Sequence, residues 1–455
     1  MTFRAALRST FALMLGFVGL ALVASTVVAG HQVFQNRAVG GVSIAADGVL
    51  SMPQETDKRL LRDDLRKSVE KPSADLNQPV ELRMISLRAL EAAIDDARRN
   101  GLGALPDEVK YLAGIQRIQY VLLYPEQNDI VLAGPGEGWK VDDAGHVVGV
   151  TTGLPVIRLD DLAIAFRSVE EARKGGITCS IDPTEAGLKE YRQVMDQAKA
   201  SKRMNDSVIS ALEKAMGPQQ ISVTGVPDTS HFARVLVASD YRMKRYAMDL
   251  DKSGVPGLPS FVSLLKTNKG ALTSALPRWW LACDYKPLAK SEDGLAFELR
   301  GPGVKVMTED DFVENGKVTR SGKSSPAAQK WADAFTAKYA ELMTKDPVFG
   351  ELRNVMDLCV VAALIHREDL LGQMNLQIPN IASEKDGMAI DQFHAPKQVS
   401  TQCSVTKSGK DFIITASGGV EINSWSVVER AESDAGVSKI RDKASGKDAK
   451  AFWWN

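Results

Sequence analysis

The residues best suited to acid–base chemistry lie in one segment near the middle of the chain, residues 217–250. His231 is one of five histidines among the 455 residues, and histidine is the usual general base near neutral pH. A hydrolytic site built on it would draw on three more residues of the segment: Asp228, Asp240 and Arg242. Ser230 and His231 are adjacent and point in different directions on a helix, which favours the competing interpretation of a capping or satisfied core histidine.

A second candidate for binding is the aromatic pair Trp279–Trp280, which follows Arg278. An exposed indole beside a guanidinium could stack on a sugar or a peptide. Successive residues of a strand face opposite sides of its sheet, so at most one of the two is buried if this segment is a strand. The default interpretation is a large core anchor, and an exposed binding tryptophan is the alternative.

Asp249, Asp251 and Ser253 provide oxygens at the first, third and fifth positions of a calcium-loop pattern. The twelfth position is Ser260, where the pattern requires a bidentate carboxylate. The favoured interpretation is therefore a polar helix end capped by Gly254. The glycine-rich segments 134–138 and 316–324 lack the spacing of dinucleotide and phosphate loops, so no cofactor is expected.

These candidates depend on a predicted strand and helix. Residues 220–227 alternate and are rich in β-branched side chains, which predicts a half-buried strand. Ser230 and its neighbours offer N-cap oxygens to a helix that begins near Phe232. We expect the charged side of this helix to be a solvated face, with a surface for an anionic partner as the alternative; it carries Arg234, Asp240, Arg242, Lys244 and Arg245.

The wider pattern predicts a mixed α/β (α+β) fold, with a β meander, alternating strands and helices, a two-helix segment and a small C-terminal β meander. The predicted parts are a signal peptide or N-terminal anchor (1–29), a β-hairpin with a polar connector (30–82), a main α/β module (83–375), a linker (376–399), the small meander (400–427) and a flexible tail (428–455).

The N-terminus indicates export. Arg4 and Arg8 precede an apolar run at 11–29 that ends in small residues, the arrangement of a secretory signal. Val27–Ala29 offers a cleavage site, and an uncleaved anchor in the membrane is the alternative. We expect a periplasmic or cell-surface protein. A formal net charge of −1 argues against a nucleic-acid partner.

The four cysteines are far apart in the sequence, which excludes a CxxC zinc or redox site. Cys359 lies in an apolar helical run and is expected to be a buried free thiol. A bridge between Cys179 and Cys283 is considered possible in an oxidising compartment. Cys179 as a nucleophile partnered by His231 is disfavoured, because nothing near it in the sequence would activate it.

Several segments together suggest a family, namely LPDEVKYLAGIQRIQYVLLYPEQNDIVLAGPGEGW, GPQQISVTGVPDTSHFARVLVASDYRMKRYAM, PRWWLACDY, AFELRGPGVKVMTEDDF and DPVFGELRNVMDLCVVAALI. Over roughly residues 83–370 the chain resembles an uncharacterised family of exported planctomycete proteins, classed as a domain of unknown function. The resemblance implies export and one extended module. It implies no catalytic residue and no substrate.

Two functions of different classes remain open. The favoured one is a non-catalytic binding or assembly module of the envelope, with protein or envelope components as partners. The alternative is a periplasmic hydrolase acting on peptidoglycan, polysaccharide or peptide. A His231 within hydrogen-bond reach of a carboxylate at a cleft would favour the hydrolase, whereas a buried His231 bonded only to backbone would count against it.

Overall fold

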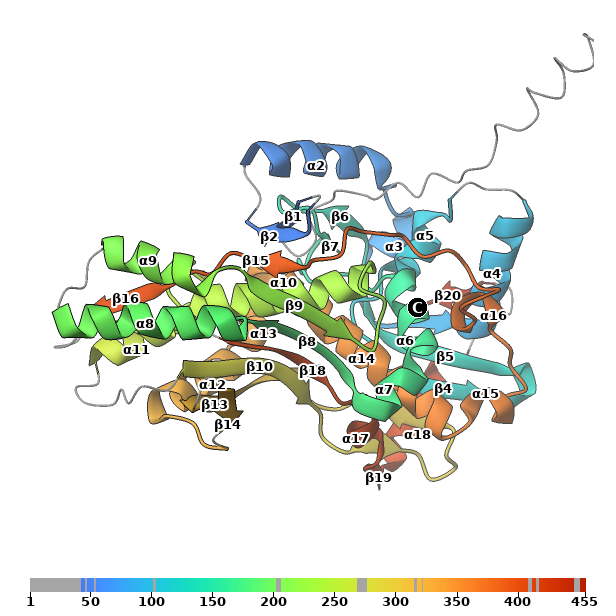
Figure 1. Ribbon diagram of the computed structural model, residues 1–455. Coiled ribbons are helices and arrows are strands. Elements are labelled where there is room, and N and C mark those ends of the chain that lie inside the picture. Colours follow the sequence, from blue (N-terminus) through green and yellow to red (C-terminus); the bar gives the residue numbers. More distant parts are fainter. Residues whose placement is uncertain are drawn as a thin grey trace, which may run out of the picture. The chain divides into compact units, whose positions relative to one another are not determined.

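A computed structural model describes residues 42–45, 47–52, 55–100, 104–201, 206–267, 276–314, 317–320, 322–407, 411–414, 417–445 and 451–455. The fold is mixed helix and strand, as predicted, with two large open sheets (Figure 1). The predicted leader at 1–29 lies outside the described residues. Within the described ranges, no helix is long and apolar enough to cross a bilayer.

The larger sheet has nine strands. Their order is β1 (Ser43–Ile44), β2 (Val49–Ser51), β15 (Gln398–Val399), β9 (Gln219–Thr224), β8 (Ile177–Asp182), β18 (Ser417–Ile422), β10 (Leu276–Asp284), β13 (Gly303–Glu314) and β14 (Lys317–Arg320). The pairs β10–β18 and β15–β2 are parallel and the others are antiparallel. The predicted hairpin around Asp47–Gly48 is confirmed as β1–β2.

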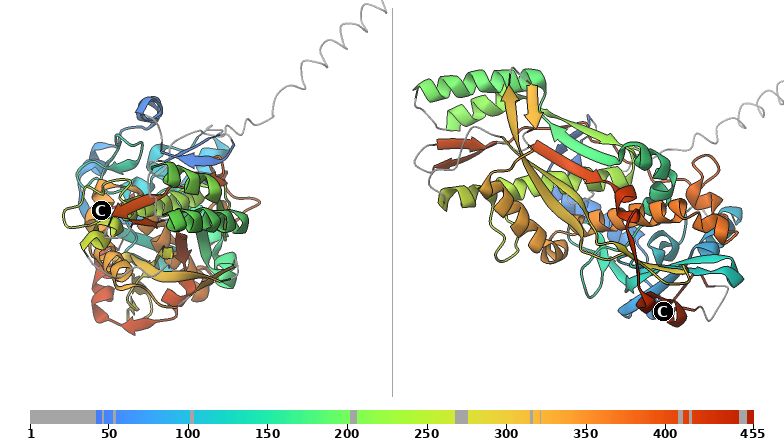
Figure 2. Two further views of the ribbon diagram at one scale, coloured as in Figure 1. Left: turned by 60° about the vertical axis from the view of Figure 1, so that its left-hand side comes forward. Right: turned by 90° about the horizontal axis from the view of Figure 1, so that it is seen from below.

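One face of this sheet is covered by α10 (His231–Ala247), which contacts β8, β9, β18 and β10. Helix α14 (Val348–Arg367) packs against α10, and α12 (Pro326–Ala337) packs on β13. The predicted strand and helix are both confirmed, and the Ser230 hydroxyl caps α10 by accepting from the Ala233 amide at 3.0 Å. The strands β18 and β10 lie in front in the view from below (Figure 2).

The prediction of a solvated charged face on this helix is wrong. Arg234 is 1% exposed, Asp240 0% and Lys244 6%. Because α10 lies between the sheet and α14, its apolar and charged sides are both enclosed, and the charged groups find partners inside the protein.

The second sheet has seven strands, ordered β19 (Ala431–Ser433), β11 (Leu288–Lys290), β12 (Ala296–Glu298), β4 (Tyr120–Tyr124), β5 (Asp129–Gly136), β3 (Val80–Ser86) and β20 (Trp453–Trp454). The region predicted as a flexible tail, 428–455, provides both edge strands and the helix α18 (Ala435–Lys443) between them. Trp453 pairs with Ile85 and its ring lies 5.4 Å from the Arg83 guanidinium.

Residues 400–427, predicted as a separate small meander, are divided. The strands β16 (Ser404–Lys407) and β17 (Asp411–Ile414) pair with each other, whereas β18 enters the middle of the nine-stranded sheet. The run Ser417–Gly418–Gly419 in the sequence predicts a turn, but both glycines lie within β18. A Cβ on Gly418 would come 1.6 Å from the Trp279 carbonyl oxygen, and one on Gly419 would come 1.8 Å from that of Cys179. Neighbouring backbones approach too closely here for any side chain.

All four cysteines are free. Cys359 is buried as a free thiol, as predicted. The considered Cys179–Cys283 bridge is not formed, because β18 lies between their strands. Two strand spacings separate them by about 9–10 Å, beyond the reach of a disulfide. Burial raises the pKa of Cys179 well above its ordinary value, which leaves it a poor nucleophile.

Candidate functional site

The middle of α10 carries a buried ion pair between Asp240 and Lys244. The Lys244 ammonium donates to Asp240 Oδ2 at 2.8 Å, one helical turn away. It also donates to the carbonyl oxygens of Ile181 at 3.3 Å and Gly418 at 3.4 Å, so it ties the helix to β8 and β18. Burial raises the pKa of Asp240 to about 6, even though Lys244 acts to lower it. The candidate catalytic residue Asp240 is therefore the ion-pair partner of Lys244, and it is Lys244 that ties the helix to the sheet.

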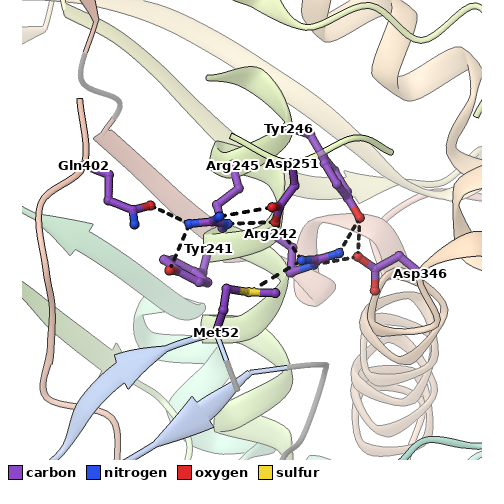
Figure 3. A network of polar contacts seen from close by, with 8 residues as sticks. All are labelled: Met52, Tyr241, Arg242, Arg245, Tyr246, Asp251, Asp346 and Gln402. Atoms are coloured by element: carbon purple, nitrogen blue, oxygen red, sulfur yellow. Dashed lines mark hydrogen bonds and ion pairs between the residues drawn. The ribbon is translucent and has the colours of Figure 1, made fainter. Parts of the chain in front are cut away.

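Arg242, also a catalytic candidate, belongs to a network at the end of α10 (Figure 3). Arg242 Nε donates to Asp346 Oδ2 at 2.8 Å and its Nη1 to Asp251 Oδ2 at 2.9 Å. Arg245 binds both oxygens of Asp251, at 2.7 and 3.0 Å. The Tyr246 hydroxyl completes the network by donating to Asp346 Oδ2 at 2.7 Å. Two guanidinium groups and two carboxylates thus join α10 to the loop after it and to the residues before α14.

The calcium-loop residues point to other partners. Asp251 is engaged by the two arginines, and Asp249 pairs with Lys252. The Ser253 hydroxyl accepts from the Val255 amide at 3.2 Å. Among the residues described, no group of three or more His, Cys, Asp or Glu side chains could hold a metal ion. The prediction that Gly254 caps the helix is wrong, because α10 already ends at Ala247. The left-handed residue after the helix is Asp249, with a φ of 60°.

His231 forms a buried pair with Asp161, a residue of α6 (Leu159–Arg167). Its Nδ1 lies 2.9 Å from one carboxylate oxygen and 3.1 Å from the other. Both side chains are nearly enclosed, at 5% and 6% exposure, and the Phe393 ring lies 6.1 Å from the imidazole. Asp228 is exposed. A carboxylate on Nδ1 is the usual way to orient a catalytic imidazole, and it is equally a way to satisfy a buried one.

A small pocket lies between α10, β8, β9 and the residues after β15. Its polar lining includes Lys244, Arg245, Tyr241 and Gln402. The cavity volume is about 30 Å³, room for one or two water molecules and too little for an organic ligand.

Trp279 and Trp280 are divided between core and surface, as expected for a strand. Trp279 is fully buried, with its ring 4.9 Å from Phe261 and 4.9 Å from Trp331, both edge-on. It is a core anchor and is not available to a ligand. Trp280 is half-buried on the other face, and the Arg278 guanidinium lies 4.9 Å from its ring centroid.

Trp280 belongs to a face of the nine-stranded sheet that we call the open face. It consists of the outward residues of β9, β8, β18, β10 and β13. One straight row across five strands, each residue directly opposite the next, is Ser222, Ser180, Gly419, Trp280 and Met307. A neighbouring row is Thr224, Thr178, Glu421, Ala282 and Lys305. Apart from Gly419, these residues are exposed or half-buried.

Of this face, Arg278 and Trp280 were predicted from the sequence as binding residues, and the other residues were missed. Ser222 and Thr224 alternate with buried or half-buried residues, and this alternation was the available signal. It predicts that one side of β9 faces solvent. It does not predict that β18, which follows β9 by almost 200 residues in the sequence, lies next to β8.

A second histidine–carboxylate pair was also missed. His146 Nδ1 lies 2.8 Å from Glu351 Oε1, and the His146 side chain is 2% exposed. Burial opposes the protonated imidazole, but Glu351 and other carboxylates outweigh it and raise the pKa of His146 to about 9. The pair is an internal ion pair between the loop after β6 (Trp139–Val141) and α14.

Residues 179–261 match the model of a family described as a protein of unknown function, DUF1598. The matched stretch runs from β8 to the first residue of α11 (Phe261–Thr267), so it contains β9, α10 and both the Asp240 and Asp251 ion pairs. It lies within the segment 83–370 that carries the resemblance and is shorter. No curated protein and no solved structure matches the chain.

Proposed function

We propose that this protein is an exported, non-catalytic binding module of the cell envelope and that the open face is its binding surface. The observation that carries the proposal is the placement of Trp280 directly opposite Met307, in a row whose serines are exposed or half-buried. Met307, at 37% exposure, is one of two exposed large hydrophobic residues in the described part of the chain. A half-buried indole beside an exposed methionine side chain, on a regular, hydrogen-bonded sheet, forms a surface suited to a ligand.

The positions of the catalytic candidates support a non-catalytic role. Asp240 is neutralised by Lys244, and Arg242 is held between Asp251 and Asp346. These contacts are internal ion pairs that connect α10 to its surroundings, and they account for the charges without a substrate.

A periplasmic hydrolase remains the second candidate, because His231 does contact a carboxylate, Asp161. Against it, the exposed fractions of both side chains are only 5% and 6%. Assays of the wild type and His231→Gln on peptidoglycan, polysaccharide and peptide substrates decide between the two: turnover that the substitution abolishes would establish the hydrolase.

Export is supported by Arg4, Arg8 and the apolar run at 11–29, and by the resemblance to exported planctomycete proteins. The full chain, expressed in a bacterium with a periplasm, is expected to be recovered there with Gly30 as its first residue. N-terminal sequencing checks this, and recovery of uncleaved chain from the membrane fraction would establish the anchor instead.

The binding role is tested by co-sedimentation of the mature protein with washed envelope fragments. Trp280→Ala is expected to remain in the supernatant. The matched control is Trp425→Ala, because Trp425 is also half-buried and has a guanidinium, that of Arg173, 5.0 Å from its ring. Trp425 lies on α17 (Ser424–Val428), away from the row that contains Trp280. Equal retention of the wild type and Trp280→Ala would contradict the proposal.

A further inference from the structure

We infer that the open face binds an uncharged polysaccharide chain and that one sugar ring stacks on the indole of Trp280. The inference rests on the proposed binding function and adds the chemical class of the ligand. A sugar ring presents an apolar C–H face and a rim of hydroxyl groups, so a suitable site needs an aromatic wall beside donors and acceptors. The surroundings of Trp280 meet both needs.

The two sides of the indole are unequal. Arg278, two residues before it on the same side of β10, lies over the ring with its guanidinium 4.9 Å from the centroid. The corresponding residue on the other side, Ala282, has only a methyl group. The next outward residue of β10 thus presents no long side chain to the second face of the indole. Arg278 holds the ring in place, which reduces the entropy lost when a ligand binds.

Hydrogen-bonding groups lie on both sides of Ala282, on the two neighbouring strands. Ala282 is directly opposite Glu421 on β18 and Lys305 on β13. A carboxylate accepts from two adjacent hydroxyl groups, and an ammonium donates to a third. Among the described residues, the ion-pair contact of Lys305 is with Asp284, at 4.0 Å. Beyond Glu421, Thr178 and Thr224 share a hydrogen bond of 2.7 Å between their hydroxyl oxygens and extend the polar row.

The charges of the open face disfavour a polyanionic ligand. Arg278 is directly opposite Glu309, and Lys305 shares its row with Glu421. Asp182 and Asp284 also lie on this face, so its described carboxylates outnumber its cations and it has no positive field to attract a polyanion. The apolar part is also narrow, since Trp280 and Met307 are flanked by hydroxyl and charged groups. A protein interface normally has a broader apolar centre.

The row is long enough for an extended chain. Adjacent strands are about 4.8 Å apart, so the four steps from Ser222 to Met307 cover about 19 Å. No side chain rises at Gly419, directly beside Trp280 in the row. The structure thus offers a long row with one aromatic platform, which fits a polymer better than a compact small molecule.

Affinity gel electrophoresis tests the inference. The mature protein is run in native gels that contain hydroxyethyl cellulose, glycol chitin or dextran as uncharged probes, and alginate or heparin as polyanions. We expect retardation by at least one uncharged probe and none by the polyanions. Trp280→Ala should raise the apparent Kd at least about tenfold. Ala282→Leu should also raise the apparent Kd at least about tenfold, because it places a bulky side chain next to the indole without removing the indole. Trp425→Ala should bind as the wild type does, and circular dichroism checks that each variant is folded.

The outcomes separate the two proposals. Retardation by polyanions alone, or retardation that Trp280→Ala and Ala282→Leu leave unchanged, would overturn the uncharged polysaccharide as the ligand of this face. If no uncharged probe binds and co-sedimentation with envelope fragments still requires Trp280, the binding module stands and its ligand class is wrong. Loss of that co-sedimentation after protease treatment of the fragments would identify a protein partner and likewise overturn the inference. If neither assay depends on Trp280, both proposals fail.

Discussion

Trp279 and Trp280 are consecutive in β10 and lie on opposite faces of the same sheet, one fully buried and the other half-buried. Trp279 sits between Phe261 and Trp331 in the core, whereas Trp280 carries Arg278 over its ring. The pleat of a single strand thus separates a residue that is enclosed in the core from one that is partly exposed to solvent.

The first prediction follows from this separation. Trp279→Ala should lower the free energy of unfolding by about 3–5 kcal/mol, because it leaves a large cavity in the core. Trp280→Ala should lower it by less than about 1 kcal/mol, because its ring is only half-buried. Urea denaturation monitored by circular dichroism checks both values. Equal losses would show that Trp280 is also a core residue and would weaken its assignment to a binding surface.

The second prediction concerns the buried pair of Asp240 and Lys244. Lys244→Met should lower the free energy of unfolding by about 3–5 kcal/mol, because it leaves a carboxylate without its partner in the core. Replacing both residues, as Asp240→Leu with Lys244→Met, should recover most of that loss, since no buried charge remains. The denaturation midpoints of the three proteins check this. A double variant less stable than Lys244→Met would mean that Asp240 has a stabilising partner besides Lys244.

The third prediction concerns Gly418, at the centre of the nine-stranded sheet. Its φ is +139°, and a Cβ would come 1.6 Å from the Trp279 carbonyl oxygen. Gly418→Ala should therefore force β18 away from β10 and destabilise the protein by more than about 2 kcal/mol. Gly153→Ala is the control, since its φ is also positive but no atom lies within 4 Å of its Cβ position. Similar losses in the two variants would attribute the effect to backbone strain alone and not to the contact between strands.

Local signals in the sequence were enough to predict individual elements. The hydroxyl of Ser230 and the apolar spacing after it predict the start of α10, and the alternation at residues 220–224 predicts β9. These features depend on residues that are close together in the sequence, where spacing alone determines which side chains share a face.

Long-range pairings were not accessible in the same way. The carboxylate on His231 comes from Asp161, 70 residues earlier, and the one on His146 comes from Glu351, 205 residues later. Charged residues on a helix normally face solvent, so Asp240 and Lys244 were expected there. Only the packing of α14 and the sheet around α10 reveals that their charges neutralise each other inside the protein.

The final prediction concerns the dependence of stability on pH. The buried carboxylate of Glu351 raises the pKa of His146 from an ordinary value of 6.5 to about 9, despite the opposing effect of burial. A histidine with a raised pKa in the folded state stabilises the fold while it is protonated. Its contribution is complete below about pH 6.5 and is lost as the pH rises through about 9. The difference corresponds to about 3 kcal/mol, so the free energy of unfolding should fall over this interval.

Urea denaturation at several pH values between 6 and 10 measures this fall. His146→Gln should be less stable than the wild type at pH 6.5 and should lose most of the slope, because no group at this position titrates in that range. His366→Gln is the matched control: His366 contacts Glu170 at the same 2.8 Å as His146 contacts Glu351, but its side chain is 43% exposed. Solvent screening makes such a pair worth little, so this variant should keep the slope of the wild type. A slope that survives in His146→Gln would show that another group is responsible and that the His146–Glu351 pair does not control stability between pH 6.5 and 9.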